Sequence, residues 1–178
     1  MTTDNRRANT KKAIQNAMVT LLKTKSFDDI TTTKLAKEAG ISRSSFYTHY
    51  KDKFELIDSC QQTLFNQIEY IFEKHVGDKE AAFLEIFEFL KREQLLSALI
   101  SANGTREFQT IIVNKVRLFI NTDFQRRFKR EKLTPVEAEY SSIYLASAFF
   151  GLCQAWIANG KKESPRQMTN LVLKLLPM

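Results

Sequence analysis

Residues 30–53, which read ITTTKLAKEAGISRSSFYTHYKDK, constrain the fold more than any other part of the chain. Leu35 and Ala39 recur at the spacing of a short amphipathic helix that stops at Gly40. Glycine suits the left-handed turn between two crossed helices because it carries no Cβ, and Ser42 can cap a second short helix. This pattern is typical of a helix-turn-helix, whose second helix enters the major groove of DNA.

These residues resemble the N-terminal domain of the tetracycline-repressor (TetR) family. In that family a Thr-rich opening, a Leu-Ala-x-x-Ala-Gly-hydrophobic-Ser core, an aromatic-Tyr-x-His-aromatic run and a Lys-x-Lys step follow in this order. The chain has these four elements at residues 31–33, 35–42, 46–50 and 51–53. The resemblance implies an all-α fold, with an N-terminal three-helix helix-turn-helix DNA-binding domain and a helical C-terminal domain for ligand binding and dimerisation.

The net charge of +7 is concentrated in the segment that carries this motif. Residues 1–53 contain 11 Lys and Arg against 5 Asp and Glu, whereas residues 54–178 contain 16 against 15. Such a basic segment fits contact with DNA phosphates. A Lys-rich solvated helix surface would show the same excess, but the coincidence with the motif favours phosphates. We therefore expect a DNA-binding domain at residues 1–53 and a regulatory and dimerisation domain at residues 54–178.

Several classes of protein are disfavoured by what the sequence lacks. It has no apolar secretory signal and no run of 18 apolar residues. Cys60 and Cys153 are too far apart for a metal or redox motif. His49 has no neighbouring Cys or carboxylate, so a phosphate or packing role is expected, and His75 is either a polar helix-end residue or a ligand contact. The sequence thus predicts a cytoplasmic protein that is not an enzyme, holds no metal or cofactor and contacts no membrane.

Hydrophobic periodicity predicts helices along the whole chain. Residues 134–137 and 164–167 each supply an N-cap, a proline at the first helical position and Glu or Gln at the third, which are strong start signals. We expect about nine helices, at residues 10–25, 32–39, 42–50, 51–75, 79–91, 93–101, 105–130, 135–159 and 165–176.

The helix predicted at residues 42–50 should read the DNA. Turning about 100° per residue, it places Phe46 and Tyr50 on its inner side and Ser44 and Thr48 on its outer side. Arg43 can pair bidentately with a guanine edge, and hydroxyl groups can bind bases or phosphates. The Thr run caps the preceding helix or binds a phosphate there.

The resemblance to the family adds that positions matching Tyr47, His49 and Lys53 bind phosphates. It also implies that the positions that face bases or nearby backbone are those matching Arg43, Ser44, Ser45 and Thr48. The expected DNA-binding residues are Thr32, Thr33, Arg43, Ser44, Ser45, Tyr47, Thr48, His49 and Lys53.

The last two helices are candidates for a dimer interface. The helix at residues 135–159 is apolar on most sides and should be buried on most sides, either in the core of the monomer or against a second subunit, as the family resemblance implies. The expected interface residues are Phe149, Phe150, Leu152, Trp156, Met168, Leu171, Val172 and Leu175.

The aromatic content of the C-terminal part, with 14 Phe in the whole chain, fits a pocket for a small apolar or aromatic effector as well as an ordinary core. The candidate lining residues are Phe72, Phe83, Phe87, Phe108, Phe119, Tyr144 and Trp156.

Together these features predict a homodimeric transcriptional repressor that binds a palindromic, double-stranded DNA operator and is released by a small-molecule effector. The alternative is a transcriptional activator or co-regulator that acts mainly through a protein partner.

Overall fold

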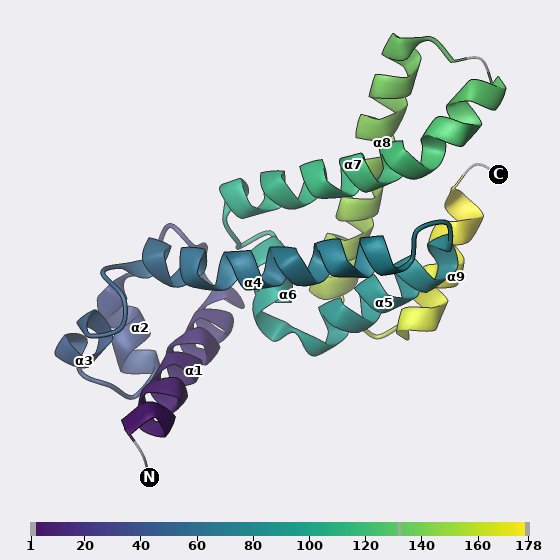
Figure 1. The fold of residues 1–178 in the computed structure, drawn as a ribbon. Coiled ribbons are helices and arrows are strands. Elements are labelled where there is room, and N and C mark those ends of the chain that lie inside the picture. The colour runs from purple at the N-terminus through teal and green to yellow at the C-terminus, as the bar shows by residue number, and fades with distance from the viewer. Residues whose placement is uncertain (1–2, 132, 177–178) are drawn as a thin grey trace. The chain divides into compact units, whose positions relative to one another are not determined.

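In a computed structural model the chain is all-α, as the sequence predicts (Figure 1). The structure describes residues 3–131 and 133–176, and for residues 3 and 121–131 it describes the backbone alone. Within these ranges it contains nine helices and no strand. The helices are α1 (Thr3–Leu22), α2 (Thr32–Glu38), α3 (Arg43–Tyr47), α4 (Lys53–Lys74), α5 (Lys79–Arg92), α6 (Gln94–Ile100), α7 (Arg106–Glu131), α8 (Pro135–Ala158) and α9 (Pro165–Leu175).

Three helix boundaries differ from the prediction by three residues or more, and one of them is the end of the first helix, at Leu22 rather than residue 25. The first helix begins at Thr3 rather than near residue 10, because Asp4 complements its N-terminus and good helix formers such as Arg6 and Ala8 follow, without any apolar periodicity to mark them. The reading helix ends at Tyr47 rather than at residue 50. Its C-cap is Thr48, whose hydroxyl donates to the Ser45 carbonyl at 2.7 Å.

Backbone contacts divide the chain into two compact units, and the division falls inside α4. The first unit comprises Met1–Leu64 and Gln94–Thr105. In it α1 packs against α2 and α6, and α2 packs against α3. The side chains at its centre are excluded from solvent, and each contributes about 1.5–3 kcal/mol through burial. These are Ile14, Met18, Leu22, Ile30, Leu35, Phe46 and Leu56.

The second unit comprises Phe65–Glu93 and Arg106–Met178, and in it α5 packs against α9 and α7 against α8. The two predicted capping boxes are confirmed. The Thr134 hydroxyl accepts the amide of Glu137 at 3.3 Å, and the Glu137 carboxylate accepts the Thr134 amide at 2.7 Å. Ser164 and Gln167 repeat the arrangement at 3.2 and 2.8 Å. These caps fix where α8 and α9 begin.

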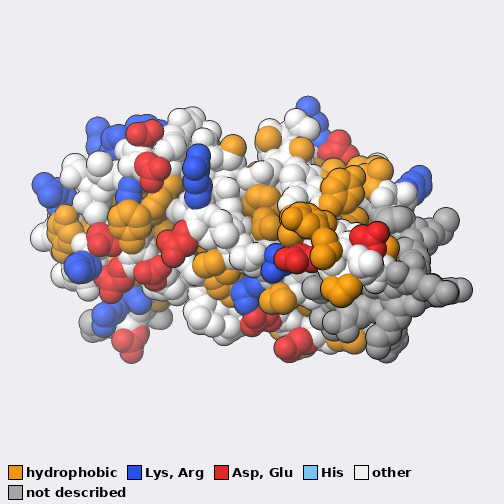
Figure 2. Space-filling view, turned by 90° about the horizontal axis from the view of Figure 1, so that it is seen from above, with side chains coloured by type: hydrophobic (Ala, Val, Ile, Leu, Met, Phe, Trp, Pro, Cys, Tyr) orange, Lys and Arg blue, Asp and Glu red, His pale blue; other side chains and the backbone are white. Residues whose placement is uncertain are grey.

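Helix α8 has an unusually apolar surface. By length and composition it is the one helix of the described chain that could cross a membrane, which is a weak indication because packed helices of other proteins pass the same test. Only 28% of its most apolar stretch is buried, and Tyr140 and Tyr144 are 68% and 72% exposed. On the face drawn in Figure 2, hydrophobic side chains are exposed among charged ones. Part of α8 therefore remains uncovered in the monomer.

Candidate nucleic-acid interface

The turn between α2 and α3 is built as the helix-turn-helix pattern requires. Gly40 has a φ of 67°, a conformation that glycine adopts without a Cβ clash. The Ile41 amide donates to the Ala36 carbonyl at 3.0 Å, and the Ser42 side chain caps α3 by accepting the Ser45 amide at 3.0 Å. These contacts fix the start of α3.

The inner and outer faces of α3 divide as the sequence predicts. Phe46 is fully buried, Tyr50 just beyond the helix is buried as well, and their rings lie 6.0 Å apart. Arg43 and Ser44 are exposed, Ser45 is half-buried, and the Ser44 hydroxyl bonds that of Ser42 at 2.9 Å. A short helix anchored by Phe46 thus presents a guanidinium and hydroxyl groups to solvent.

Tyr47 links α3 to the start of α2. Its hydroxyl lies 3.1 Å from the Thr32 hydroxyl. The hydrogen bond with Thr32 lowers the pKa of the exposed Tyr47 hydroxyl, and hydrogen bonding with Arg43 lowers it further. A hydroxyl with a lowered pKa is a better donor to an anion. The structure therefore brings Thr32, Arg43 and Tyr47 into one polar group on the surface of the helix pair.

The N-terminus of α2 holds the other predicted threonine. Thr31 is the N-cap, and its hydroxyl accepts the Lys34 amide at 3.2 Å. Thr33 is exposed in the first turn. Thr31 thus caps α2, and Thr33 lies exposed beside it in the first turn.

His49 occupies a half-buried position beside cations. Its Nδ1 is buried without a hydrogen-bond partner, and the pKa of the ring is lowered by burial first and then by Arg7 and Lys11 of α1. A proton on Nδ1 would have no acceptor, which favours the neutral tautomer with its proton on Nε2. Arg7 was missed because the predicted first helix began after it, whereas Lys11 lies within that predicted helix and its proximity to His49 depends on packing.

Lys53 is engaged inside the first unit. Its Nζ donates to the carbonyls of Phe27 at 2.8 Å and Asp28 at 3.0 Å, and it lies 4.6 Å from the centroid of the Phe27 ring. The ammonium group therefore has two protein acceptors, which distinguishes it from the other predicted DNA-binding side chains.

The aromatic residues predicted for an effector pocket form two packed groups in the second unit. Phe72 and Phe119 stack with centroids 4.0 Å apart, and Phe108 stacks on Phe65 at 5.1 Å. The second group joins α5 to α8, with Phe87 between Phe149 and Trp156 at 5.8 and 5.3 Å and Phe83 also against Phe149. Tyr144 lies outside both groups because it is exposed.

The residues predicted for a dimer interface divide by burial. Leu171 and Leu175 are 40% and 66% exposed on α9, and Phe150 and Leu152 are partly exposed on α8. The others are buried within the second unit: Phe149, Trp156, Met168 and Val172. Exposed Tyr140 and Ile143 of α8 extend the uncovered apolar surface; their outward position could be read only from the packed structure.

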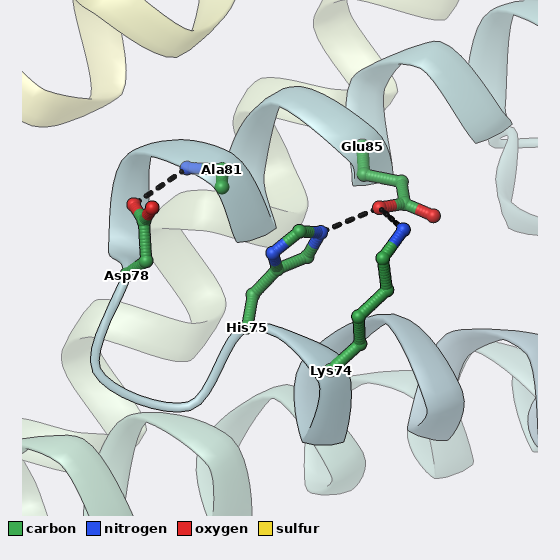
Figure 3. Close-up of polar contacts among 5 residues, drawn as sticks. All are labelled: Lys74, His75, Asp78, Ala81 and Glu85. Atoms are coloured by element: carbon green, nitrogen blue, oxygen red, sulfur yellow. Dashed lines mark hydrogen bonds and ion pairs between the residues drawn. The ribbon is translucent and has the colours of Figure 1, made fainter.

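His75 is part of a polar contact between α4 and α5 (Figure 3). Its Nε2 lies 2.5 Å from Oε2 of Glu85, and Lys74 Nζ lies 3.0 Å from the same oxygen. The hydrogen bond with His75 lowers the pKa of Glu85, and that with Lys74 lowers it further. This arrangement ties the end of one helix to the next, and among the described residues no group of side chains is suited to hold a metal.

The fold and this surface define a helix-turn-helix DNA-binding protein with a helical C-terminal part. The sequence model described as "Bacterial regulatory proteins, tetR family" matches residues 14–60, and that described as "Transcriptional regulator C-terminal region" matches residues 77–177. The second match alone covers more than half of the chain, so the chain belongs to the TetR family of transcriptional regulators and is a DNA-binding regulator.

Individual relatives are distant. An uncharacterized HTH-type transcriptional regulator, YxbF of Bacillus subtilis (strain 168), is 23% identical over 177 residues, which cover 92% of this chain but only 43% of that relative. The structure of NalD, the secondary repressor of the MexAB-OprM multidrug efflux pump in Pseudomonas aeruginosa, has a TM-score of 0.65 at 21% identity, covering 96% of this chain and 95% of that one.

The structure of the transcriptional regulator FadR from Bacillus subtilis, in complex with stearoyl-CoA, also has a TM-score of 0.65, at 16% identity over 93% of this chain and 96% of that one. At such identities the two solved structures show a shared fold.

Proposed function

We propose that the chain is a homodimeric repressor that binds a two-fold-related DNA operator through α2 and α3. The observation that carries this proposal is the exposed face of α3, where Arg43 stands beside the Thr32–Tyr47 hydrogen bond on a helix fixed by buried Phe46. Arg43 pairs with a guanine edge in the major groove, as a bidentate donor can.

The remaining contacts divide into two kinds. Ser44, Ser45 and Thr48 face bases or the nearby backbone from α3. Thr32, Thr33, Tyr47 and His49 bind phosphates, which set the register of the protein on the duplex but do not read its sequence. In this proposal the DNA-binding domain spans residues 1–53, up to the first residue of α4, and the regulatory and dimerisation domain spans residues 54–178.

Dimerisation is proposed through the exposed apolar surface of α8 and α9. A helix with exposed Tyr140 and Tyr144 needs cover, and large exposed apolar patches often mark protein–protein interfaces. A two-fold dimer would carry two copies of α3 and would therefore require a roughly palindromic site, with half-sites one DNA turn or a multiple apart.

An apolar or aromatic small molecule is the proposed effector, bound in the aromatic part of the second unit. One solved relative of the same fold was crystallised with stearoyl-CoA. Because the rings of Phe72 and Phe119 stack against each other, such a ligand would have to separate packed side chains. Thermal unfolding in the presence of stearoyl-CoA, with coenzyme A as control, tests this part of the proposal. A rise in melting temperature with stearoyl-CoA alone supports it, whereas equal melting temperatures would exclude long-chain acyl compounds as effectors.

The decisive experiment for the main proposal is selection of random duplex DNA by the purified chain, followed by sequencing. Enrichment of two inverted half-sites supports a dimeric DNA-binding regulator, whereas no enrichment would refute operator binding by the chain alone. The alternative is an activator or co-regulator that works through a protein partner. A reporter gene that carries the selected site distinguishes it from a repressor. Loss of the chain raises reporter expression for a repressor and lowers it for an activator.

A further inference from the structure

Phe27, in the loop between α1 and α2, is held on both sides of its backbone. Its amide donates to the carbonyl of Asn103 at 2.8 Å, and its carbonyl accepts from Lys53 Nζ at 2.8 Å. The ring is 4% exposed, lies under the same ammonium group and meets the ring of Phe54 edge-on at 5.5 Å. One loop residue thus joins the start of α4 to the turn after α6.

Asn103 makes a second contact with the same region. Its side-chain amide donates to the carbonyl of Leu22 at 2.8 Å, and Leu22 is the last residue of α1. Carbonyls at a helix C-terminus lack intrahelical partners, so Asn103 caps α1 while its own carbonyl holds the loop. The turn that presents it is tight: a Cβ on Gly104 would lie 1.7 Å from the carbonyl oxygen of Leu99. Only glycine fits there, and the position of Asn103 is fixed accordingly.

The loop held in this way leads directly into α2. Lys53 also binds the carbonyl of Asp28, and Lys34 Nζ binds that of Asp29 at 2.8 Å. Three consecutive carbonyls before α2 therefore accept from lysine ammonium groups. Since α2 carries Thr32, whose hydroxyl bonds Tyr47 of α3, a shift of the loop would move both helices that face DNA.

We propose that Lys53 and Asn103 are positioning residues for DNA binding, which fasten the backbone of Phe27 and thereby set the placement of α2 and α3. This inference rests on the proposed function. Lys53 acts from inside the first unit and not as a phosphate contact. Asn103 belongs to the DNA-binding machinery although it lies 81 residues from Leu22 in sequence.

The two segments that contact Phe27 both continue along the chain into the second unit. Helix α4 continues past Leu64 into the second unit, and the segment after Asn103 enters that unit at Arg106. Both segments that grip Phe27 are therefore covalently continuous with the second unit. Both contacts therefore lie in segments through which the chain passes from the first unit into the second.

The test uses Lys53→Met and Asn103→Ala in the full chain, with Lys51→Met and Asn114→Ala as controls. Lys51 and Asn114 are exposed residues of the same types. Affinity for the selected duplex is measured over a series of salt concentrations. Because each substitution removes hydrogen bonds that hold the loop, each should weaken binding by roughly three- to tenfold, with the salt dependence of the parent. A phosphate contact would instead lower the salt slope by about 0.9.

A second measurement concerns the free chain. Amide hydrogen exchange should accelerate over residues 27–38 in both variants and remain unchanged in α9. The double variant should lose less affinity than the product of the two single losses, because both residues hold the same backbone. Lys53→Arg, which keeps a cation with several donors, should restore affinity. Where a first variant does not fold, as judged by circular dichroism, Lys53→Gln and Asn103→Ser replace the pair.

Two results would overturn the inference: a salt slope that falls by about one for Lys53→Met alone, or exchange over residues 27–38 that matches the parent in both variants. Failure of the proposed function looks different. In that case the parent itself binds no selected duplex, while the exchange experiment still reports whether the two residues hold the loop.

Discussion

Arg43 is the side chain on which the recognition of DNA bases should depend most. It is the first residue of α3, it is exposed, and it helps to lower the pKa of the Tyr47 hydroxyl. A bidentate pair with guanine is worth about 1–3 kcal/mol of discrimination. Arg43→Ala should therefore weaken binding to the best duplex by roughly 5- to 150-fold. The preference should be lost at one base position in each half-site and kept elsewhere.

The same substitution should leave the fold intact, so a loss of DNA affinity can be attributed to lost base recognition and not to unfolding of the protein. A cation in the first turn of a helix opposes the helix dipole by about 0.3–1 kcal/mol at exposed sites, and alanine has the highest helix propensity. Since Arg43 is exposed and begins α3, the melting temperature of Arg43→Ala should equal or slightly exceed that of the parent.

The assay is fluorescence anisotropy with a panel of duplexes that each carry one changed base pair. Lys37→Ala, which removes an exposed cation from the last turn of α2, is the matched control and should retain the full pattern of preferences. If Arg43→Ala loses affinity by the same factor on every duplex and keeps the parental preferences, Arg43 contacts the backbone and does not read a base.

Three further predictions concern assembly, pH and the turn. Leu175→Glu on α9 should convert a dimer to a monomer in analytical ultracentrifugation, while Asn170→Glu, also exposed on α9, should not; identical sedimentation of the two would place the interface elsewhere. The pKa of Glu85 is lowered from its ordinary value of 4.5, so its stabilising effect is present above that value and is lost as the pH falls through the lowered folded pKa. The difference in free energy of unfolding between the parent and Glu85→Gln, from urea titrations, should therefore shrink below pH 4.5, and a difference that grows there would contradict the assignment. Gly40→Ala should destabilise the chain by about 1–2 kcal/mol because φ is positive, whereas Gly151→Ala, in the middle of α8 with open space around it, should not; equal melting temperatures would refute the strain argument.

The helices were predictable where the sequence carries local signals. Apolar periodicity marks α4 to α9, and the Thr134 and Ser164 caps mark the starts of α8 and α9. Local signals fail where no apolar period exists, as in the first two turns of α1. They also miss the end of α3, which lies at Tyr47 with Thr48 as the C-cap.

The exposed face of the candidate site was predictable from the sequence, but the contacts that hold its helices in place were not. Burial of Phe46 follows from helical spacing, and so does the exposure of Arg43 and Ser44. The contacts of Lys53 and Asn103 join segments 26 and 81 residues apart. Such contacts depend on how helices pack, and neither a period nor a cap in the sequence reports them.

In the proposed homodimer, the exposed surface of α8 would link assembly to the recognition of DNA. An isologous interface uses the same patch on both subunits, so exposed Tyr140 and Tyr144 of one copy must find cover on the same helices of the other. A two-fold axis fixed in this way also relates the two copies of α3. In the proposed dimer, operator symmetry would follow from the apolar face of α8 and α9, and base preference would follow from Arg43. Substitutions on α9 should therefore abolish the requirement for paired half-sites while preserving the preferred base within each.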